Sequence, residues 1–203
     1  FREWLLLLDA NLATEGQRRA FAYVMAHELA HQWFGNLVTM PWWDDIWLNE
    51  AFATWMGSKV VHELHPEFRS DLSSLASAQR AMRLDSLASA RSIRQPILSN
   101  HDIHNAFDAI TYEKGGGVLS MFEHWMGEEA FRDGVRLYLE KHRNGTATST
   151  DLLAALDRVT ELDIAPPFTT FLTQPGVPWV STSVADDGCS GETRTLALRQ
   201  ERY

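Results

Sequence analysis

Cysteine is almost absent from this chain of 203 residues, since Cys189 is its only example. A single thiol excludes an internal disulfide and any cysteine-rich zinc site, although it does not fix the cellular compartment. Basic residues are also scarce, with 18 Lys and Arg against 27 Asp and Glu and a net charge of −9. Because such a chain has no basic stripe to neutralise phosphates, we expect no nucleic acid partner.

Long apolar runs are missing as well. The leucines at residues 5–8 form a run of four, far shorter than the roughly 20 apolar residues of a membrane-spanning helix. They also lack the basic flank and the cleavage site of a signal peptide. We therefore expect no membrane segment in this chain, and these patterns leave its oligomeric state open.

Apolar residues at helical spacing are typical of residues 1–174, whereas residues 175–203 contain β-branched residues in alternation. A chain of this length can bury one good core. The sequence therefore predicts a mainly α fold with a short C-terminal β segment, and a domain boundary near residues 174–176. The expected helices cover 17–34, 49–64, 66–90, 112–126, 128–142, 148–160 and a turn at 167–172, the strands cover 177–184 and 193–198, and a long loop covers 92–107.

The most informative motif is His-Glu-Leu-Ala-His at residues 27–31. His27 and His31 are four residues apart, so on a helix they lie one turn apart on the same face and can bind one divalent ion. Glu28 lies beside the first histidine and can act on a water at the metal without being a ligand. Glu50 follows after an eighteen-residue gap, in a second predicted helix, and supplies a third ligand. Three protein ligands and one open position are typical of a catalytic zinc site.

Other interpretations of the motif are weaker. Two histidines at this spacing can also be partly buried residues that only form hydrogen bonds. A metzincin would need a glycine and a third histidine further along, where this chain has Phe34 and Leu37. The convincing helical pattern around the motif and the acidic residue in the next helix favour a site with two histidines and one glutamate.

Peptide hydrolysis develops negative charge on the carbonyl oxygen, so a second electrophile beside the metal assists it. Tyr112 follows the long loop at the start of a glycine-rich helix and could supply a hydroxyl group. By residue type alone, a tyrosine in this position is more often a packing residue. The sequence therefore makes Tyr112 a candidate and leaves its role open.

Several residues near the motif allow two interpretations. Asp44 and Asp45 could orient a metal-bound imidazole or cap the helix that contains Glu50, and Asn49 could position that glutamate. For the tryptophans we expect core packing, with a substrate pocket as the alternative for one of them. These tryptophans are Trp33, Trp42, Trp43, Trp47 and Trp55. Four further histidines are expected at the surface, namely His101, His104, His124 and His142.

Residues 27–39, followed by Trp-Leu-Asn-Glu at 47–50, closely resemble the aminopeptidase N-like family of zinc metallopeptidases. The resemblance covers nearly the whole chain. It implies a thermolysin-like zincin catalytic module with one Zn²⁺ per chain, bound by His27, His31 and Glu50. It also implies that Glu28 is the general base, and then the general acid, of hydrolysis.

Two further segments carry the resemblance. Tyr-Glu-Lys-Gly at residues 112–115 is similar to the family segment whose tyrosine stabilises the tetrahedral intermediate, so the resemblance assigns that role to Tyr112. Residues 171–178 resemble the exit from the family's catalytic domain, and residues 195–203 resemble the start of its next β-domain. The resemblance thus implies a catalytic domain over 1–174 and the beginning of a β-domain over 175–203.

The chain also departs from the family pattern. It has no Gly-Ala-Met-Glu-Asn strand, whose glutamate holds the free α-amine of the substrate, and the resemblance implies that residues 1–7 follow that strand and its upstream sheet. Smaller differences are Ala51, where glycine is usual, and Gly116, where alanine is frequent. A substrate amine without a carboxylate partner loses both binding and alignment. We therefore expect these 203 residues alone to hydrolyse aminoacyl substrates poorly or not at all.

The function expected from these patterns is zinc-dependent hydrolysis of the N-terminal peptide bond of peptides that have a free N-terminus. The alternatives are a metal-binding but inactive fragment, or a relative with endopeptidase or epoxide-hydrolase activity at the same metal. The preferred N-terminal residue of the substrate does not follow from the sequence.

Overall fold

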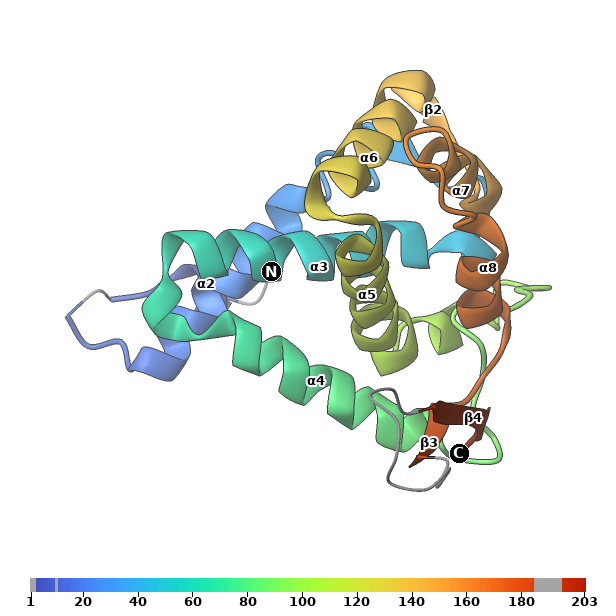
Figure 1. Ribbon diagram of the computed structural model, residues 1–203. Helices are drawn as coiled ribbons and strands as arrows, with labels where there is room; N and C mark the ends of the chain where they lie inside the picture. The colour runs from blue at the N-terminus through green and yellow to red at the C-terminus, as the bar shows by residue number, and fades with distance from the viewer. Residues whose placement is uncertain (1–2, 10, 185–194) are drawn as a thin grey trace.

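Helices make up most of the chain, as predicted, in a computed structural model that describes residues 3–9, 11–184 and 195–203 (Figure 1). Cys189 and the first two residues of the strand expected at 193–198 lie outside the described residues. The helices are α1 (Glu3–Leu6), α2 (Glu15–Ala30), α3 (Trp47–Leu64), α4 (Ser70–Asp85), α5 (Gly115–Met126), α6 (Glu128–His142), α7 (Ser149–Asp157) and α8 (Ala165–Thr173). The strands are β1 (Val38–Thr39), β2 (Gly145–Thr146), β3 (Pro178–Val184) and β4 (Leu196–Arg202), and the short helical turns are η1 (Trp43–Asp45), η2 (Pro66–Phe68), η3 (Ile103–Ala106) and η4 (Ile110–Lys114).

The mainly α fold with a C-terminal pair of strands is therefore confirmed. Within the described residues, none of the helices is both long enough and apolar enough to cross a membrane.

Helix α3 runs through the middle of the helical body and contacts α2, α4, α5 and η4 (Figure 1). Its Trp47 and Phe52 side chains are fully buried. The same core cluster includes Phe122 of α5 and Phe168 of α8, whose rings stack with centroids 4.2 Å apart. Because α3 is buried on several sides, any residue that it presents to a cleft is held on a rigid support.

Helix α2 begins with a capping box. The Thr14 side chain accepts a hydrogen bond from the backbone N–H of Gln17, and the Gln17 side chain accepts one from the N–H of Thr14. The helix expected over 17–34 ends at Ala30, because a series of turns follows. His31 nevertheless keeps right-handed helical angles, with φ −61° and ψ −17°, so the one-turn relation to the preceding histidine is preserved.

A buried polar cluster fixes the start of α3. Asp45 is 1% exposed and accepts hydrogen bonds from the Ser149 backbone N–H at the start of α7 and from Arg94 Nε, at 3.3 and 2.8 Å. Trp47 Nε1 donates to Ser149 Oγ at 3.0 Å, and Asp44 pairs with Arg94. Neither role expected for the two aspartates is observed, since they tie α3 to α7 and to the long loop rather than orienting a histidine or capping α3. Arg94 is distant in sequence, but its positive charge offsets the free-energy cost of burying the Asp45 carboxylate.

Strands β1 and β2 form a small parallel pair that the sequence did not predict. Val38 lies opposite Gly145, and Ala147 N–H donates to the carbonyl oxygen of Thr39 at 2.9 Å. Strands of two residues show no measurable alternation, so no sequence pattern indicates them. The pair joins the segment after α2 to the segment between α6 and α7.

The helix expected over 66–90 is divided in two. Arg69 has a positive φ of 50°, which breaks the helical path between η2 and α4. Helix α4 then ends at Asp85, and residues 92–107 form a loop that includes only the short turn η3.

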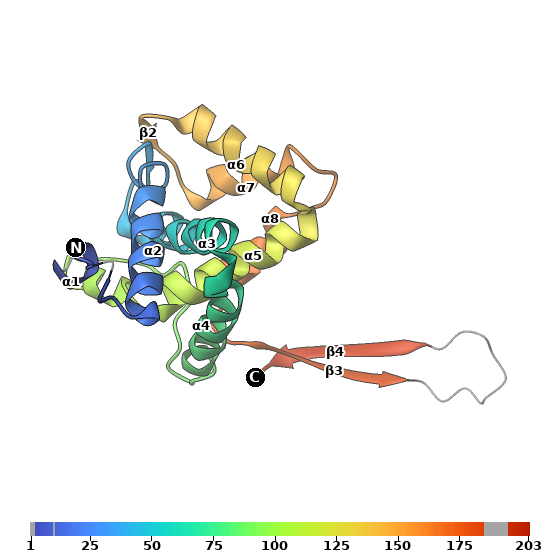
Figure 2. The same ribbon diagram turned by 90° about the vertical axis from the view of Figure 1, so that its left-hand side faces the viewer.

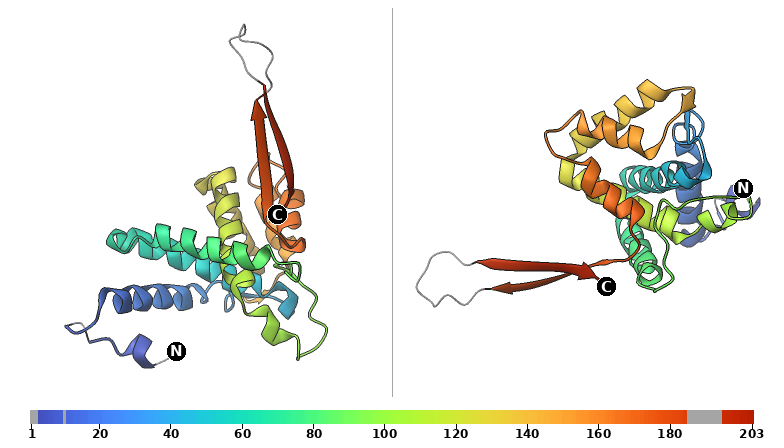
Figure 3. Two further views of the ribbon diagram at one scale, coloured as in Figure 1. Left: turned by 90° about the horizontal axis from the view of Figure 1, so that it is seen from below. Right: turned by 90° about the vertical axis from the view of Figure 1, so that its right-hand side faces the viewer.

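Strands β3 and β4 form an antiparallel hairpin that extends away from the helical body (Figures 2 and 3). Pro178 pairs with Arg202 at one end and Val184 pairs with Leu196 at the other. All residues of both strands are exposed. The hairpin therefore contributes nothing to the core around α3.

Two glycines at the start of α5 are expected to respond oppositely to alanine. A Cβ atom on Gly115 would lie 2.7 Å from the Ala51 Cβ of α3, whereas one on Gly117 would meet only Ala78 Cβ, at 3.8 Å. Gly115→Ala should lower the free energy of unfolding by about 1–3 kcal/mol because α3 and α5 must separate. Gly117→Ala should leave it unchanged or raise it by up to about 1 kcal/mol, since alanine favours helix. Urea denaturation measures both, and equal midpoints for the two variants would contradict this packing.

Candidate metal and catalytic site

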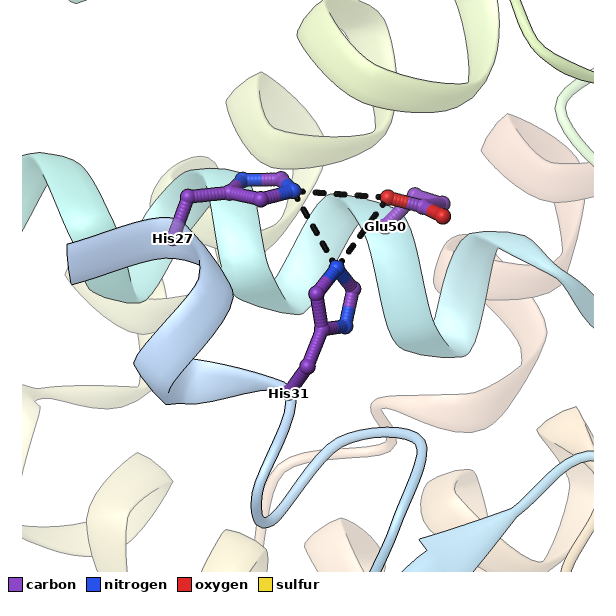
Figure 4. Close-up of side chains that lie close together, drawn as sticks. All are labelled: His27, His31 and Glu50. Carbon is purple, nitrogen blue, oxygen red and sulfur yellow. Dashed lines mark hydrogen bonds and ion pairs between the residues drawn. The ribbon is translucent and has the colours of Figure 1, made fainter. Parts of the chain in front are cut away.

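Three side chains converge between α2 and α3 (Figure 4). His27 and His31 extend from α2 and its last turn, and Glu50 extends from the first turns of α3. The two Nε2 atoms are 3.2 Å apart, and each lies 3.4 Å from Glu50 Oε2. The structure thus brings together the three residues that the sequence proposed as metal ligands.

His27 Nε2, His31 Nε2 and Glu50 Oε2 form a triangle, and its sides can be compared with the separations of ligand atoms around a zinc ion. Zinc bonds to nitrogen and oxygen are about 2.0–2.1 Å long, and in a tetrahedron this places neighbouring ligand atoms about 3.3 Å apart. The three observed separations of 3.2, 3.4 and 3.4 Å fit that value. Within the described part of the chain, no other set of three His, Cys, Asp or Glu residues is placed to hold a metal ion.

The hydrogen bond of His31 selects a suitable tautomer. Its Nδ1 lies 2.9 Å from the carbonyl oxygen of Phe34, which can only accept, so Nδ1 carries the proton and Nε2 presents a lone pair. His27 Nδ1 is buried and has no partner among the described residues. A cluster of lone pairs at 3.2–3.4 Å repels itself unless a cation is shared between them, which is what a metal ion or a proton would do.

The pKa values of the cluster reflect this shared charge. Burial alone would raise the pKa of Glu50, but hydrogen bonds with His27 and His31 outweigh burial and lower it to about 2. The hydrogen bond with Glu50 is also the main reason that the pKa of His31 is raised. Glu50 is therefore a carboxylate at all ordinary pH values, which is the form that binds a metal.

Glu28 lies outside this triangle. It is exposed on α2 and is not one of the converging donors. Its negative charge nevertheless contributes to raising the pKa values of both His31 and Tyr112.

Tyr112 lies beside the cluster, in the π-helical turn η4. Its ring stacks on that of His27, with centroids 6.1 Å apart and an angle of 25° between the planes. Burial raises the pKa of Tyr112, and the charges of Glu50 and Glu28 raise it further. The phenol therefore keeps its proton at neutral pH and remains a hydrogen-bond donor. Single π-helical turns are rare and are frequently found at functional sites.

The sequence analysis missed a second phenol at this site. Tyr23 lies one turn before His27 on α2, with ring centroids 6.1 Å apart. Burial raises its pKa, as do the charges of Glu113 and Glu50. The sequence could have indicated Tyr23, because it lies four residues before His27 and residues at this spacing share one face of a helix.

The remaining candidates have other surroundings. Asn49 Nδ2 lies 3.1 Å from Met40 Sδ, and no hydrogen bond joins it to Glu50 in the described structure. Trp47 and Trp55 are core residues as expected, whereas Trp33 and Trp42 are about half exposed. Among the other histidines, those at 101, 104 and 124 are exposed, and the one at 142 is partly buried.

Comparison with known sequences agrees with this geometry. The Peptidase family M1 domain matches residues 1–171. The chain belongs to peptidase family M1. The resemblance inferred from the motifs is thereby confirmed, and the histidine and glutamate cluster agrees with a family of zinc metallopeptidases.

Several aminopeptidases are similar to nearly the whole chain. The leucyl aminopeptidase of Saccharolobus solfataricus is 40% identical over 204 residues, which is 100% of this chain and 25% of that protein. The aminopeptidase N of Lactococcus lactis subsp. lactis is 38% identical over 206 residues, covering 100% of the chain and 23% of the relative. The mitochondrial aminopeptidase 2 of Saccharomyces cerevisiae is 41% identical over 199 residues, covering 98% and 20%. The chain thus spans a quarter or less of the length of these relatives.

Proposed function

We propose that this chain forms the catalytic centre of a zinc-dependent aminopeptidase. The observation that carries the proposal is the triangle of donor atoms from His27, His31 and Glu50. Its sides agree with the separations expected between ligand atoms in a tetrahedral zinc site. The names of the relatives, which are aminopeptidases, support the same activity. Peptides with a free N-terminus are the proposed substrates.

The proposed roles follow from where the residues lie. Zinc, when bound by the three ligands, supplies Lewis-acid polarisation of the substrate carbonyl and lowers the pKa of a water molecule. The Glu28 carboxylate accepts a proton from the attacking water and passes it to the nitrogen of the leaving amine. The Tyr112 hydroxyl donates a hydrogen bond to the carbonyl oxygen as negative charge develops on it. Its raised pKa supports this role, because a phenolate could not donate.

We also propose that the catalytic domain covers residues 1–174 and that residues 175–203 begin a β-domain. Helix α8 ends at Thr173 and β3 begins at Pro178, and all residues of β3 and β4 are exposed. Those facts support a change of domain between the two elements.

A ladder of peptides tests the proposed activity. The intact protein should release the first residue from peptides with a free α-amine and should leave the same peptides untouched when they are N-acetylated. Mass spectrometry of the products distinguishes this from endopeptidase activity, which would cut both series internally. Equal cleavage of the acetylated series would overturn the aminopeptidase proposal.

A further inference from the structure

Arg91 forms several hydrogen bonds next to and within η4, the turn that contains Tyr112. Its guanidinium group faces the Asp108 carboxylate with two nitrogens, and Nε lies 3.2 Å from Oδ2. The nitrogen Nη2 also donates to Thr111 Oγ1 at 2.8 Å and to the carbonyl oxygen of Ala106 at 3.3 Å. The side chain of Arg91 is only 16% exposed, so this is a desolvated charge with several fixed partners.

Asp108 transmits this contact to the backbone of η4. Its Oδ1 accepts hydrogen bonds from the N–H groups of Ile110 and Thr111, at 2.9 and 3.3 Å. Its carbonyl oxygen accepts the N–H of Tyr112 at 3.2 Å. One aspartate therefore binds three successive N–H groups that a helix start leaves without partners. The orientation of this aspartate is in turn fixed by Arg91.

The other end of η4 is held in the same way. Lys114 Nζ lies 2.7 Å from Asp85 Oδ2, and the Asp85 side chain is 2% exposed. Both external partners, Asp85 and Arg91, come from the end of α4 and the residues just after it. Thr111 is fully buried, so the residue before the tyrosine cannot swing outward. The π-helical turn is thus fixed at both ends by charged side chains.

We propose that Arg91 is a positioning residue for Tyr112, acting through Asp108 and Thr111. The inference rests on the proposed function, because it assigns Arg91 the task of holding the Tyr112 hydroxyl where the carbonyl oxygen of the substrate will lie. Displacement of a catalytic group by about 1 Å can cost roughly 10²-fold in rate. The contacts of Asp108 and Lys114 supply external support to both ends of this π-helical turn.

The first experiment observes the ring directly and does not depend on activity. In protein labelled with 3-fluorotyrosine, the ¹⁹F resonance of Tyr112 is assigned by its loss in Tyr112→Phe. Arg91→Lys keeps the charge but loses the fork that binds Asp108 and Thr111 together. We expect this variant to broaden or split the Tyr112 resonance and to leave the zinc content unchanged.

A matched control is available at the other end of α4. Arg69 also contacts an aspartate with two nitrogens, since Nε and Nη2 lie 3.0 and 2.9 Å from the two oxygens of Asp71. That pair is at the surface, at the opposite end of α4 from Asp85. Arg69→Lys should leave the Tyr112 resonance as it is in the wild-type protein.

The second experiment is a double-mutant cycle on turnover in the intact protein. Arg91→Lys should lower kcat by about 10- to 100-fold with little change in KM, and it should have no further effect in the Tyr112→Phe background. Thr111→Val removes one acceptor at nearly constant volume and should act in the same direction, whereas Thr111→Ser keeps the hydroxyl and should restore kcat. The threonine variants keep the test valid if Arg91→Lys folds poorly.

The outcomes separate this inference from the proposed function. An equal loss of kcat in both tyrosine backgrounds, or an unchanged ¹⁹F resonance in Arg91→Lys, would overturn the positioning role. If Tyr112→Phe itself leaves kcat unchanged, the role proposed for the Tyr112 hydroxyl fails. In that case the fluorine spectra still decide whether Arg91 holds the ring.

Discussion

Replacing Glu28 with glutamine is expected to lower turnover by about 10²- to 10⁴-fold, the usual contribution of a general base. The amide has nearly the same shape but cannot accept a proton at neutral pH. Zinc should remain bound at close to one ion per chain, because Glu28 is not one of the three converging donors. Measuring kcat on unblocked peptides and the zinc content of the same sample by mass spectrometry tests both parts.

A glutamate on the same helix provides the control for this substitution. Glu15 lies in the first turn of α2, where it pairs with Arg19 at the surface. Glu15→Gln should change kcat by less than about threefold, since surface ion pairs contribute little. If Glu28→Gln remained active, the mechanism proposed for this site would be wrong. Loss of zinc from that variant would instead make Glu28 part of the metal site.

Replacing Glu50 with glutamine is expected to abolish stable zinc binding, and turnover with it. Loss of a residue that only orients a ligand typically costs 10- to 100-fold in metal affinity, so loss of a ligand should cost about 10²-fold or more. The charge matters as much as the contact, because Glu50 is the only anion among the three donors and its pKa of about 2 keeps it ionised. Competition with a chelator of known affinity measures the change.

Glu63 is a suitable control, since it lies on the same helix α3 and is exposed. Glu63→Gln should bind zinc as the wild-type protein does. Circular dichroism should show that Glu50→Gln keeps its helices, because the core around α3 does not depend on this carboxylate. A zinc affinity within tenfold of wild type in Glu50→Gln would show that a different group supplies the third ligand.

Much of the site could be predicted because its geometry is local. The spacing of His27 and His31 determines their distance on any helix, and α3 begins within two residues of its expected start. Helix α6 was predicted with its observed limits, since its apolar face is clear and a glycine precedes it. For these elements prediction succeeded because periodicity within one element decides their structure.

The rest depends on contacts between distant segments. Arg91 and Asp108 are separated by sixteen residues of loop, and no pattern in the sequence pairs them. The same holds for Asp45 and Ser149, which are 104 positions apart and whose contact excludes the roles expected for Asp45. Two-residue strands such as β1 and β2 carry too few side chains to show a period.

The three proposed metal ligands lie close together in the sequence, whereas Tyr112 lies far from them. His27, His31 and Glu50 fall within 24 consecutive residues on two neighbouring helices, so little loop-closure entropy separates them in the unfolded chain. Tyr112 reaches the same cluster only after α4, the long loop and η4 are in place. We therefore expect the proposed metal site to depend mainly on α2 and α3, whereas the role proposed for Tyr112 depends also on the segments that follow α3.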